Sequence, residues 1–533
     1  MSTYPDTIPP PWYVTTAIPY VNARPHLGFA LEAILTDALA RYHRLKGEDV
    51  RFLTGTDENS LKNVQAAERE GISTAALVER NATYFQALRE PLNLSFDDFI
   101  RTSSDPRHAP GAEKLWEACA RQGDIYKRAY RGLYCVGCEQ FYTEDELVGG
   151  LCPEHLTRPE VVEEENYFFR LSRYADHLRD LIESDQLRIL PQTRKNETLS
   201  LIRQGLTDFS ISRSRARAHD WGIPVPGDPE QVMYVWYDAL SNYITALDYA
   251  DNGPLYQRYW LHNPNRVHII GKGILRFHTV YWPAILLSAG VPLPTSIFVH
   301  GYVTLGGDKI SKTLGNVIDP VALVDQYGTD PLRYYLLREI PASDDGDYTQ
   351  DRFIRAYNGD LADQLGNLLN RVVNMVNRYY KGVVPTLSPT WGALPLLRRQ
   401  AEGLRGRVEQ AMEQFAPDKA LEAIWELVGA ANKYAQETQP WELAKQRKTS
   451  ADAEAELARS LYNLLEALRL IAWHCQPFLP ATAEAIAAQL GIRLEDAGDW
   501  SQATRWGGLQ PGTTIQPGGV LFPKLEAVTE VAS

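Results

Sequence analysis

The pattern of hydrophobic and polar positions at the start of the chain predicts a strand, a helix and a second strand. Residues Trp12–Ile18 alternate and are rich in β-branched side chains, which favours a strand. Apolar residues then recur at helical spacing over Leu27–Lys46, and Val50–Gly55 resembles an apolar strand. Because parallel strands need such a crossover, we expect a β-α-β unit. Its ligand should lie beyond the carboxyl ends of the strands, near Tyr20–His26 and Asp57.

A second run of the same pattern far downstream predicts that the parallel sheet continues after an insertion. The elements expected there are a strand at Val267–Ile270, a helix at Ile274–Ala289 and a strand at Ser296–His300. The insertion covers 119–225. We therefore expect an α/β domain whose two halves, 1–118 and 226–320, are separated in the sequence by a smaller domain.

From about Asp351 the pattern changes to long amphipathic helices. It predicts an all-α bundle over 351–533, joined to the α/β part by a linking segment at 321–350. Stretches rich in Pro and Gly at Val383–Pro395 and Trp506–Gly519 are typical of linkers or surface excursions.

Composition adds limits to this picture. The 533 residues are 44% hydrophobic and 23% charged, which predicts several folded domains and excludes a disordered or fibrous protein. The sequence has no long uncharged apolar run and no apolar signal core near Met1, so we expect a cytoplasmic protein with no membrane partner. The net charge of −13 argues against coating nucleic acid non-specifically, but it leaves room for an RNA bound in a local basic groove.

Three of the five cysteines lie close together in the insertion. The spacing Cys135-x-x-Cys138 followed by Cys152-x-x-His155 is typical of two knuckles around one tetrahedral Zn²⁺. The alternative is a set of unligated thiols. Since four protein ligands leave no open position for water, we predict one structural zinc per chain that stabilises the insertion.

Two motifs are suited to phosphate. His26-Leu27-Gly28-Phe29 opens the first helix, where backbone N–H groups and the helix dipole favour an anion. Lys309 and Lys312 lie in a glycine-flanked loop that can fold over a triphosphate and neutralise a leaving pyrophosphate. Each motif alone is equally compatible with a surface histidine or a solvated loop.

Together, HLGF after the first strand and KISKT after the last resemble the two signature motifs of class I aminoacyl-tRNA synthetases. Further stretches are similar to the methionyl branch of that family, and the resemblance runs from about Tyr13 to Val520. These stretches are TGTDEN at 54–59, NYFFRLS at 166–172, FSISR at 209–213, WGIPVP at 221–226, YVWYDAL at 234–240 and IGKGILRFH at 270–278.

The resemblance implies a Rossmann-like parallel-sheet catalytic domain with a zinc-knuckle insertion, followed by a helical anticodon-binding domain, and it makes 321–350 a region that contacts the tRNA stem. It implies ligation of methionine to tRNA(Met) at the expense of ATP, with Mg²⁺ accompanying the ATP. The implied ATP-binding residues are His26, Gly28, Lys309, Ser311 and Lys312, of which His26, Lys309 and Lys312 are catalytic.

The resemblance also implies the remaining site residues. Asp57 would pair with the ammonium group of methionine. The side-chain pocket would be lined by Ile18, Tyr20, Trp236, Ala239, Tyr243, Ile274, Phe277, His278 and Tyr281. Asn374, Arg378 and Trp441 would read the anticodon, since such groups bond and stack on unpaired bases. Taken alone, each aromatic residue is more typical of core packing, and Asp57 could equally be a helix cap. The family's usual dimerising extension is not found after Val520, so we expect a monomer.

The sequence departs from the family pattern at four places. Phe29 stands where the first motif has a second histidine, Asn59-Ser60 where many relatives have His-Gly, and Ile310 and Thr313 replace Met and Ser. These departures keep a second hypothesis open, a non-catalytic or altered-specificity paralogue. A synthetase for a branched amino acid would need a large editing insertion that the stretch between the two motifs is too short to hold. A synthetase for cysteine is expected to place its metal ligands in the substrate pocket, whereas the predicted ligands of this chain lie in the insertion.

Overall fold

The computed structural model describes residues 9–154, 156–309, 317–387, 396–495 and 499–526. The chain folds into two compact units. The first comprises residues 1–36 and 49–300, and the second comprises residues 37–48 and 301–533.

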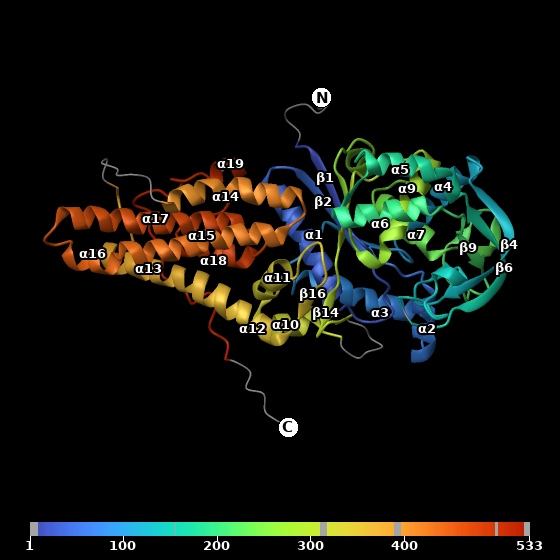
Figure 1. Ribbon diagram of the computed structural model, residues 1–533, viewed down its shortest axis with the longest axis horizontal. Helices are drawn as coiled ribbons and strands as arrows, with labels where there is room; N and C mark the ends of the chain where they lie inside the picture. The colour runs from blue at the N-terminus through green and yellow to red at the C-terminus, as the bar shows by residue number, and fades with distance from the viewer. Residues whose placement is uncertain (1–8, 155, 310–316, 388–395, 496–498, 527–533) are drawn as a thin grey trace, which may run out of the picture. The chain divides into compact units, whose positions relative to one another are not determined.

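The first unit is built on a six-stranded sheet in which every neighbouring pair is parallel (Figure 1). The strand order is β3 (Asp98–Arg101), β2 (Asp49–Thr56), β1 (Pro11–Thr16), β12 (Arg266–Gly271), β13 (Ser296–His300) and β7 (Arg188–Leu190). The chain runs outward from β1 through β2 to β3 on one side, and from β12 to β13 on the other. The order therefore reverses between β1 and β12, which is where doubly wound sheets bind their ligands.

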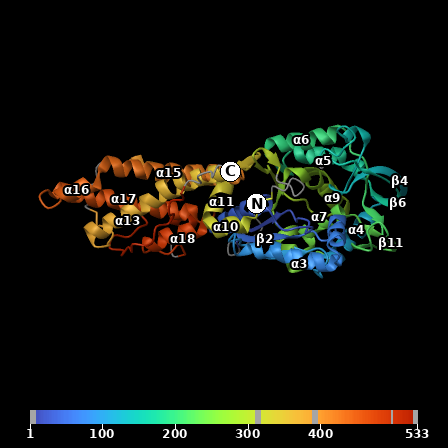
Figure 2. The same cartoon turned by 90° about the horizontal axis from the view of Figure 1, so that it is seen from below.

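Helices cover both faces of this sheet, as such hydrophobic strands require. Figure 2 shows α5 (Ala175–Glu183) and α6 (Gln192–Arg203) on one side of β2, and α3 (Thr74–Gln86) on the other. The other helices of this unit are α2 (Leu61–Glu70), α4 (His108–Arg121), α7 (Val235–Thr245), α8 (Pro254–Tyr256), α9 (Trp282–Ala289) and the first part of α1 (Leu27–Leu45). The predicted β-α-β start is confirmed, with β1, α1 and β2 in order.

The helix expected at Ile274–Ala289 is broken into three pieces. A 3₁₀ turn at Lys272–Ile274 is followed by a π-helical turn at Phe277–Tyr281, and only then by α9. Pro283 is the second residue of α9, and because proline has no N–H it cannot continue the hydrogen-bond ladder of the preceding turn. The hydrophobic period alone does not reveal this break, and π-helical turns are frequent at functional sites.

Two small antiparallel sheets lie in the insertion and directly after it. One has the order β5 (Gln140–Tyr142), β4 (Ile125–Cys135), β6 (Glu160–Phe169) and β8 (Phe209–Ser210), and the other has β10 (Pro224–Val225), β11 (Asp228–Met233) and β9 (Ser212–Ser214). The segment 119–225 also contains β7, which pairs with β13 at the edge of the main sheet. The main sheet thus takes a strand from the segment assigned to the insertion, since three residues are too short for periodicity to place.

The second unit is mainly helical, as the amphipathic pattern predicts. Its helices are α10 (Pro320–Tyr327), α11 (Thr329–Arg338), α12 (Gln350–Ala356), α13 (Asn367–Tyr380), α14 (Leu396–Glu413), α15 (Pro417–Thr438), α16 (Pro440–Gln446), α17 (Ala451–Cys475), α18 (Pro480–Gln489) and α19 (Trp500–Ala503), with a π-helical stretch at Tyr357–Gly366 before α13. A small sheet has the order β15 (Asp308–Lys309), β14 (Val303–Leu305) and β16 (Gly346–Tyr348). Among the helices described, none combines the length and apolar character needed to cross a bilayer.

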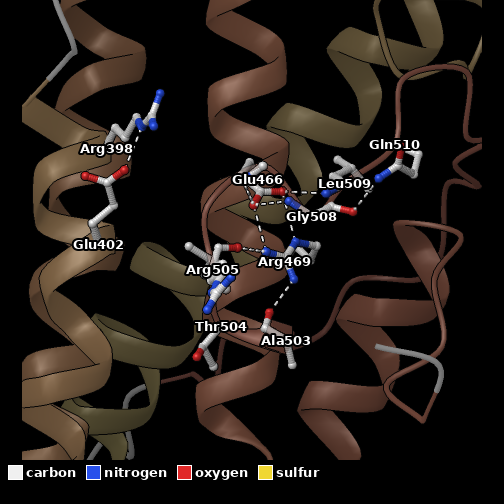
Figure 3. Close-up of polar contacts among 12 residues, drawn as sticks. Arg398, Glu402, Glu466, Arg469, Ala503, Thr504, Arg505, Gly508, Leu509 and Gln510 are labelled. Carbon is white, nitrogen blue, oxygen red and sulfur yellow. Dashed lines mark hydrogen bonds and ion pairs between the residues drawn. The ribbon is translucent and has the colours of Figure 1, made fainter. Parts of the chain in front are cut away.

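The two Pro- and Gly-rich stretches of this unit are paired with each other rather than free. Val384 N–H donates to the carbonyl of Thr513, and Gly512 N–H donates to the carbonyl of Val384. The returning chain is also fixed by a buried ion pair on α17, in which Arg469 lies between Glu466 and the carbonyls of Ala503 and Arg505 (Figure 3). The segment from Ala503 to Thr513 is therefore part of the helical core.

Candidate functional site

The first phosphate motif lies at the reversal point of the sheet, beyond the carboxyl end of β1. His26 precedes α1, and its carbonyl accepts the N–H groups of Phe29 and Ala30. The N–H of Gly28 donates to Nδ1 of His26 over 3.1 Å, so this imidazole holds its proton on Nε2 when neutral. A Cβ at position 28 would lie 2.9 Å from the His26 ring, and glycine is therefore required for this arrangement.

Phe29 is turned into an apolar cluster. Its ring packs edge-on against Phe85 of α3 at a centroid distance of 5.2 Å, in a cluster that also contains Val21 and Leu77. A histidine here would have to leave this packing or bury an imidazole. The departure from the family motif is thus accommodated by local hydrophobic contacts.

Asp57 follows β2 and lies in the interior, with 2% of its surface exposed. Its N–H donates to the carbonyl of Pro19 over 2.9 Å, which brings the ends of β1 and β2 together. Burial raises the pKa of Asp57 well above its usual range, and the carboxylates of Asp238 and Glu139 raise it further. Among the residues that the structure describes, no lysine or arginine forms an ion pair with Asp57. A bound ammonium group would stabilise its charged form.

The Asn that replaces histidine at position 59 connects this loop to α7. Asn59 Nδ2 donates to Asp238 Oδ2 over 2.7 Å, and Asp238 Oδ1 accepts from His108 Nε2 over 2.6 Å. Asp238 is fully buried at the start of α7. The substitution therefore retains a hydrogen-bond donor beside the buried carboxylate, which would otherwise lack one of its partners.

Aromatic rings from three segments meet next to Asp57. Trp236 stacks on Phe277 with ring centroids 3.7 Å apart and an interplanar angle of 4°, and Tyr20 approaches Trp236 edge-on at 6.4 Å. Tyr20 and Asp57 form a parallel β-bridge. The structure thus brings these four predicted residues together from the segments that follow β1 and β2, from α7 and from the π-helical turn.

Tyr243 and His278 form a buried pair in the same region. Tyr243 Oη lies 2.7 Å from His278 Nε2, and His278 Nδ1 lies 3.0 Å from the carbonyl of Ile274. A carbonyl only accepts, so Nδ1 carries the proton and the Tyr243 hydroxyl donates to Nε2. Burial lowers the pKa of His278 to about 4, which keeps the ring neutral at pH 7.

The remaining predicted pocket residues are buried or partly buried. Ile18 and Ile274 are partly buried against the main core, and Ala239 is buried on α7. Tyr281 packs on Phe277 at 5.4 Å, but it stacks more closely on Phe209, at 4.0 Å. Tyr281 is therefore also a packing partner of the insertion.

The three cysteines converge as the spacing predicts. The sulfur atoms of Cys135, Cys138 and Cys152 all lie within 4.8 Å of one another, and those of Cys138 and Cys152 are 3.3 Å apart. Ligands of a tetrahedral zinc thiolate site lie about 3.8 Å apart, given Zn–S bonds of about 2.3 Å. The donor set and its spacing therefore fit Zn²⁺. The fourth predicted ligand, His155, lies outside the described residues.

The lysine motif is described only at its first member. The backbone of Lys309 pairs with Thr304 in the β14–β15 hairpin of the second unit. Ser311 and Lys312 lie outside the described residues.

The predicted RNA-binding residues lie on one part of the helical unit. Asn374 and Arg378 are exposed one turn apart on α13, and Asn374 Nδ2 donates to Asn370 Oδ1 over 2.8 Å. The guanidinium of Arg371 lies 5.6 Å from the ring centroid of Trp441 on α16. Trp441 is thereby brought to the helix that carries the other two residues.

Sequence reasoning missed three charged residues in these regions. Glu32 on α1 accepts the N–H of Ala17 over 2.7 Å and pairs with His300 Nε2 over 2.9 Å. Arg371 contacts Trp441, and Glu139 of the insertion bonds to the first turn of α2. No local pattern marks them, because each is defined by a partner distant in the sequence.

Comparisons with known proteins agree with this geometry. The profile of the family described as "tRNA synthetases class I (M)" matches residues 12–158 and 155–373, and that described as "Anticodon binding domain of methionyl tRNA ligase" matches residues 396–531.

Relatives with assigned activity match along nearly the whole chain. The chain is 44% identical over 523 residues to the methionine--tRNA ligase of Caldanaerobacter subterraneus subsp. tengcongensis, covering 98% of this chain and 80% of the relative. It is 44% identical over 541 residues to the methionine--tRNA ligase of Bacillus subtilis, covering 98% and 79%. The solved Mycobacterium tuberculosis methionyl-tRNA synthetase in complex with methionyl-adenylate is similar with a TM-score of 0.91 and 45% identity, covering 96% of this chain and 100% of that one. The chain belongs to the methionyl family of class I tRNA synthetases, the methionine--tRNA ligases.

Proposed function

We propose that this enzyme activates L-methionine with ATP and transfers the methionyl group to tRNA(Met), with the residues of the first unit acting as follows. Asp57 pairs with the substrate ammonium, and the stacked rings of Trp236 and Phe277 enclose the thioether side chain. The observation that carries this proposal is the buried carboxylate of Asp57 beside an aromatic wall, because an unbranched thioether with a cationic amine needs both.

In the first step, a carboxylate oxygen of methionine attacks the α-phosphorus of ATP in line, and the bond to the β-phosphate breaks to release pyrophosphate. His26 donates from Nε2 to a phosphate, at a helix start whose dipole favours negative charge. Lys309 and Lys312 neutralise the pyrophosphate, and Ser311 and Gly28 complete the nucleotide contacts. Mg²⁺ accompanies ATP and offsets its charge. No side chain forms a covalent intermediate.

In the second step, a hydroxyl of the terminal adenosine of tRNA attacks the carbonyl carbon of the adenylate, and AMP leaves. The helical unit selects the tRNA: Asn374 and Arg378 bond to anticodon bases and Trp441 stacks on one. The exposure of Asn374 and Arg378 on one helix face supports this assignment.

One zinc ion would be held by Cys135, Cys138, Cys152 and His155. A closed set of four ligands supplies folding free energy and no reactive position. A chelator should therefore lower the melting temperature, and zinc should restore it. A purified protein that holds no zinc and melts unchanged would contradict this role. The cytoplasm, where thiols stay reduced, suits such a site, and we expect a monomer by analytical ultracentrifugation.

The test of the proposed function is amino-acid-dependent exchange of pyrophosphate into ATP without tRNA, run with all twenty amino acids. Exchange with methionine alone is expected. Exchange with a different amino acid would overturn the substrate assignment. No exchange from a folded, zinc-loaded sample would favour a non-catalytic paralogue.

A further inference from the structure

Glu139 lies where the cysteine cluster meets the segment that carries Asp57. It directly follows Cys138 in a left-handed backbone conformation, with a φ of 52°, and its side chain is 0% exposed. Its Oε1 atom accepts from Ser60 Oγ over 2.7 Å and from the N–H of Lys62 over 3.2 Å. One buried carboxylate thus joins the insertion to the first turn of α2.

The surroundings of this carboxylate compensate for its burial. Ser60 is the N-cap of α2, so the positive end of the helix dipole faces Glu139. On the other side, Arg213 Nη2 donates to Glu139 Oε2 over 3.3 Å. A buried carboxylate requires such hydrogen bonds, and removing it would take away the acceptor of the Ser60 hydroxyl and the anion that faces Arg213.

The first turn of α2 in turn fixes Asp57. Asn63, in that turn, donates from Nδ2 to the carbonyl of Asp57 over 3.1 Å, and the N–H of Asn59 donates to Asp57 Oδ1 over 3.3 Å. The loop between β2 and α2 is therefore held at both ends, by the carbonyl of Pro19 at Asp57 and by Glu139 at Ser60. The position of the Asp57 carboxylate depends on both anchors.

Cys138 and Glu139 also contact the segment that carries the stacked ring of Trp236. Trp236 Nε1 donates to the carbonyl of Cys138 over 3.4 Å, and the Tyr234 hydroxyl donates to the carbonyl of Glu139. Cys138 and Glu139 thus contact both the loop that carries Asp57 and the start of α7, which carries Trp236.

We infer that Glu139 is a positioning residue for methionine recognition, which holds the Asp57 loop and the Trp236 wall in register through Ser60 and Tyr234. The inference rests on the proposed function of Asp57 and Trp236 in binding methionine. It assigns to the insertion a role in substrate affinity in addition to its own folding, since catalytic geometry depends on the residues that support it.

The test is the kinetics of pyrophosphate exchange by the full-length, zinc-loaded Glu139→Gln variant. Glutamine keeps the size of the side chain, but only one of its two terminal atoms, the carbonyl oxygen, accepts hydrogen bonds. It therefore cannot replace both carboxylate oxygens, of which one accepts from Ser60 and Lys62 and the other from Arg213. We expect the KM for methionine to rise about tenfold, the scale of one lost hydrogen bond to a charged group. The KM for ATP should stay within about twofold of the wild type.

Two further variants make the result specific. Glu144→Gln alters an exposed carboxylate in the same insertion and should change neither KM. Ser60→Ala removes the donor to Glu139 Oε1 and should also raise the KM for methionine. The double variant Ser60→Ala/Glu139→Gln should raise the KM for methionine by less than the product of the two single effects, because the two residues share the Ser60–Glu139 hydrogen bond. Ser60→Ala alone carries the test if Glu139→Gln does not fold.

An unchanged KM for methionine in these variants, or an equal rise in both KM values, would overturn the inference. A wild-type enzyme that exchanges no pyrophosphate with methionine would instead overturn the proposed function, so the two failures are distinguishable.

Discussion

Two buried carboxylates, one in each unit of the molecule, differ in how their hydrogen bonds are supplied. In the helical unit, Glu466 is fully buried and accepts hydrogen bonds from Arg469 and from the backbone N–H groups of Gly507, Gly508 and Leu509 (Figure 3). In the sheet unit, Asp57 is 2% exposed and accepts one weak hydrogen bond, from the N–H of Asn59.

If Asp57 pairs with the substrate ammonium as proposed, the difference distinguishes a structural charge, Glu466, from a binding charge, Asp57. When the protein itself supplies the partners of a buried ion, the ion is compensated in the folded state. Removing one partner leaves an uncompensated buried charge and lowers the free energy of unfolding. A buried carboxylate without a cation is costly in the free protein, and that cost is offset only when a cationic ligand arrives. The contrast predicts that substitution of Asp57 lowers catalytic activity, whereas substitution of Glu466 lowers the free energy of unfolding.

The largest effect is expected for Asp57→Asn. Removing one partner of a buried ion pair costs about 4 kcal/mol, so methionine-dependent pyrophosphate exchange should fall about a thousandfold. The melting temperature should stay unchanged or rise, because asparagine carries no buried charge. Exchange and thermal melting, measured on the same sample, check both parts. A variant that melts several degrees lower would show that Asp57 is a structural charge as well.

Glu466→Gln should show the opposite behaviour. It leaves Arg469 buried next to an amide in place of a carboxylate, so the free energy of unfolding should fall by about 3 kcal/mol. Pyrophosphate exchange below the melting transition should be retained. Denaturant unfolding gives the first value. The matched control is Glu402→Gln, which removes a partly exposed pair with Arg398 on α14 and should cost less than about 1 kcal/mol.

Trp441→Ala should separate the two reactions. Loss of one base-stacking ring costs about 1 to 3 kcal/mol, so tRNA charging should fall at least about fivefold while pyrophosphate exchange is unchanged. Arg371→Ala removes the guanidinium next to this ring and should reduce charging by a smaller factor. Equal losses in charging and exchange would identify a folding role for Trp441.

The smallest effect is a loss of stability on mild acidification, shared by both units. Burial lowers the pKa of His278 and of His474 to about 4 each. Since the unfolded value is about 6.5, the unfolded state binds more protons between these values, and stability falls as pH decreases from 6.5 towards 4. Between pH 7 and 5.5 each histidine should contribute about 1 kcal/mol. Urea unfolding of His474→Gln should show a weaker pH dependence than the wild type, and an equal dependence would contradict the assignment.

The sequence predicts the architecture of both units well because their signals are local. Periodicity predicts β1, α1 and β2 closely. The rule that ligands bind beyond the carboxyl ends of parallel strands predicts a site near Asp57. The cysteine spacing predicts the cluster of Cys135, Cys138 and Cys152. Periodicity does not predict the irregular turns before α9 or the short strand β7. The turns depend on Pro283, and β7 is defined by only three residues that pair with β13.

The supporting contacts of the site were not predictable from sequence. Glu139 bonds to Ser60, Asn59 bonds to Asp238, and Glu32 bonds to the backbone of Ala17, but none of these pairs has a spacing that marks it. Tertiary structure creates them by bringing segments together at the end of the sheet. Local patterns therefore indicate which residues can react, whereas the fold determines which residues hold them in place.

The measurement that tests the central claim most directly is calorimetric binding of methionine and of its desamino analogue to the wild type and to Asp57→Asn. If Asp57 is the cation partner, the wild type should bind methionine at least about a hundredfold more tightly than the analogue, and the variant should bind both with similar, weak affinity. A variant that keeps the wild-type preference for methionine would contradict the assignment of Asp57 as the charge that recognises the substrate.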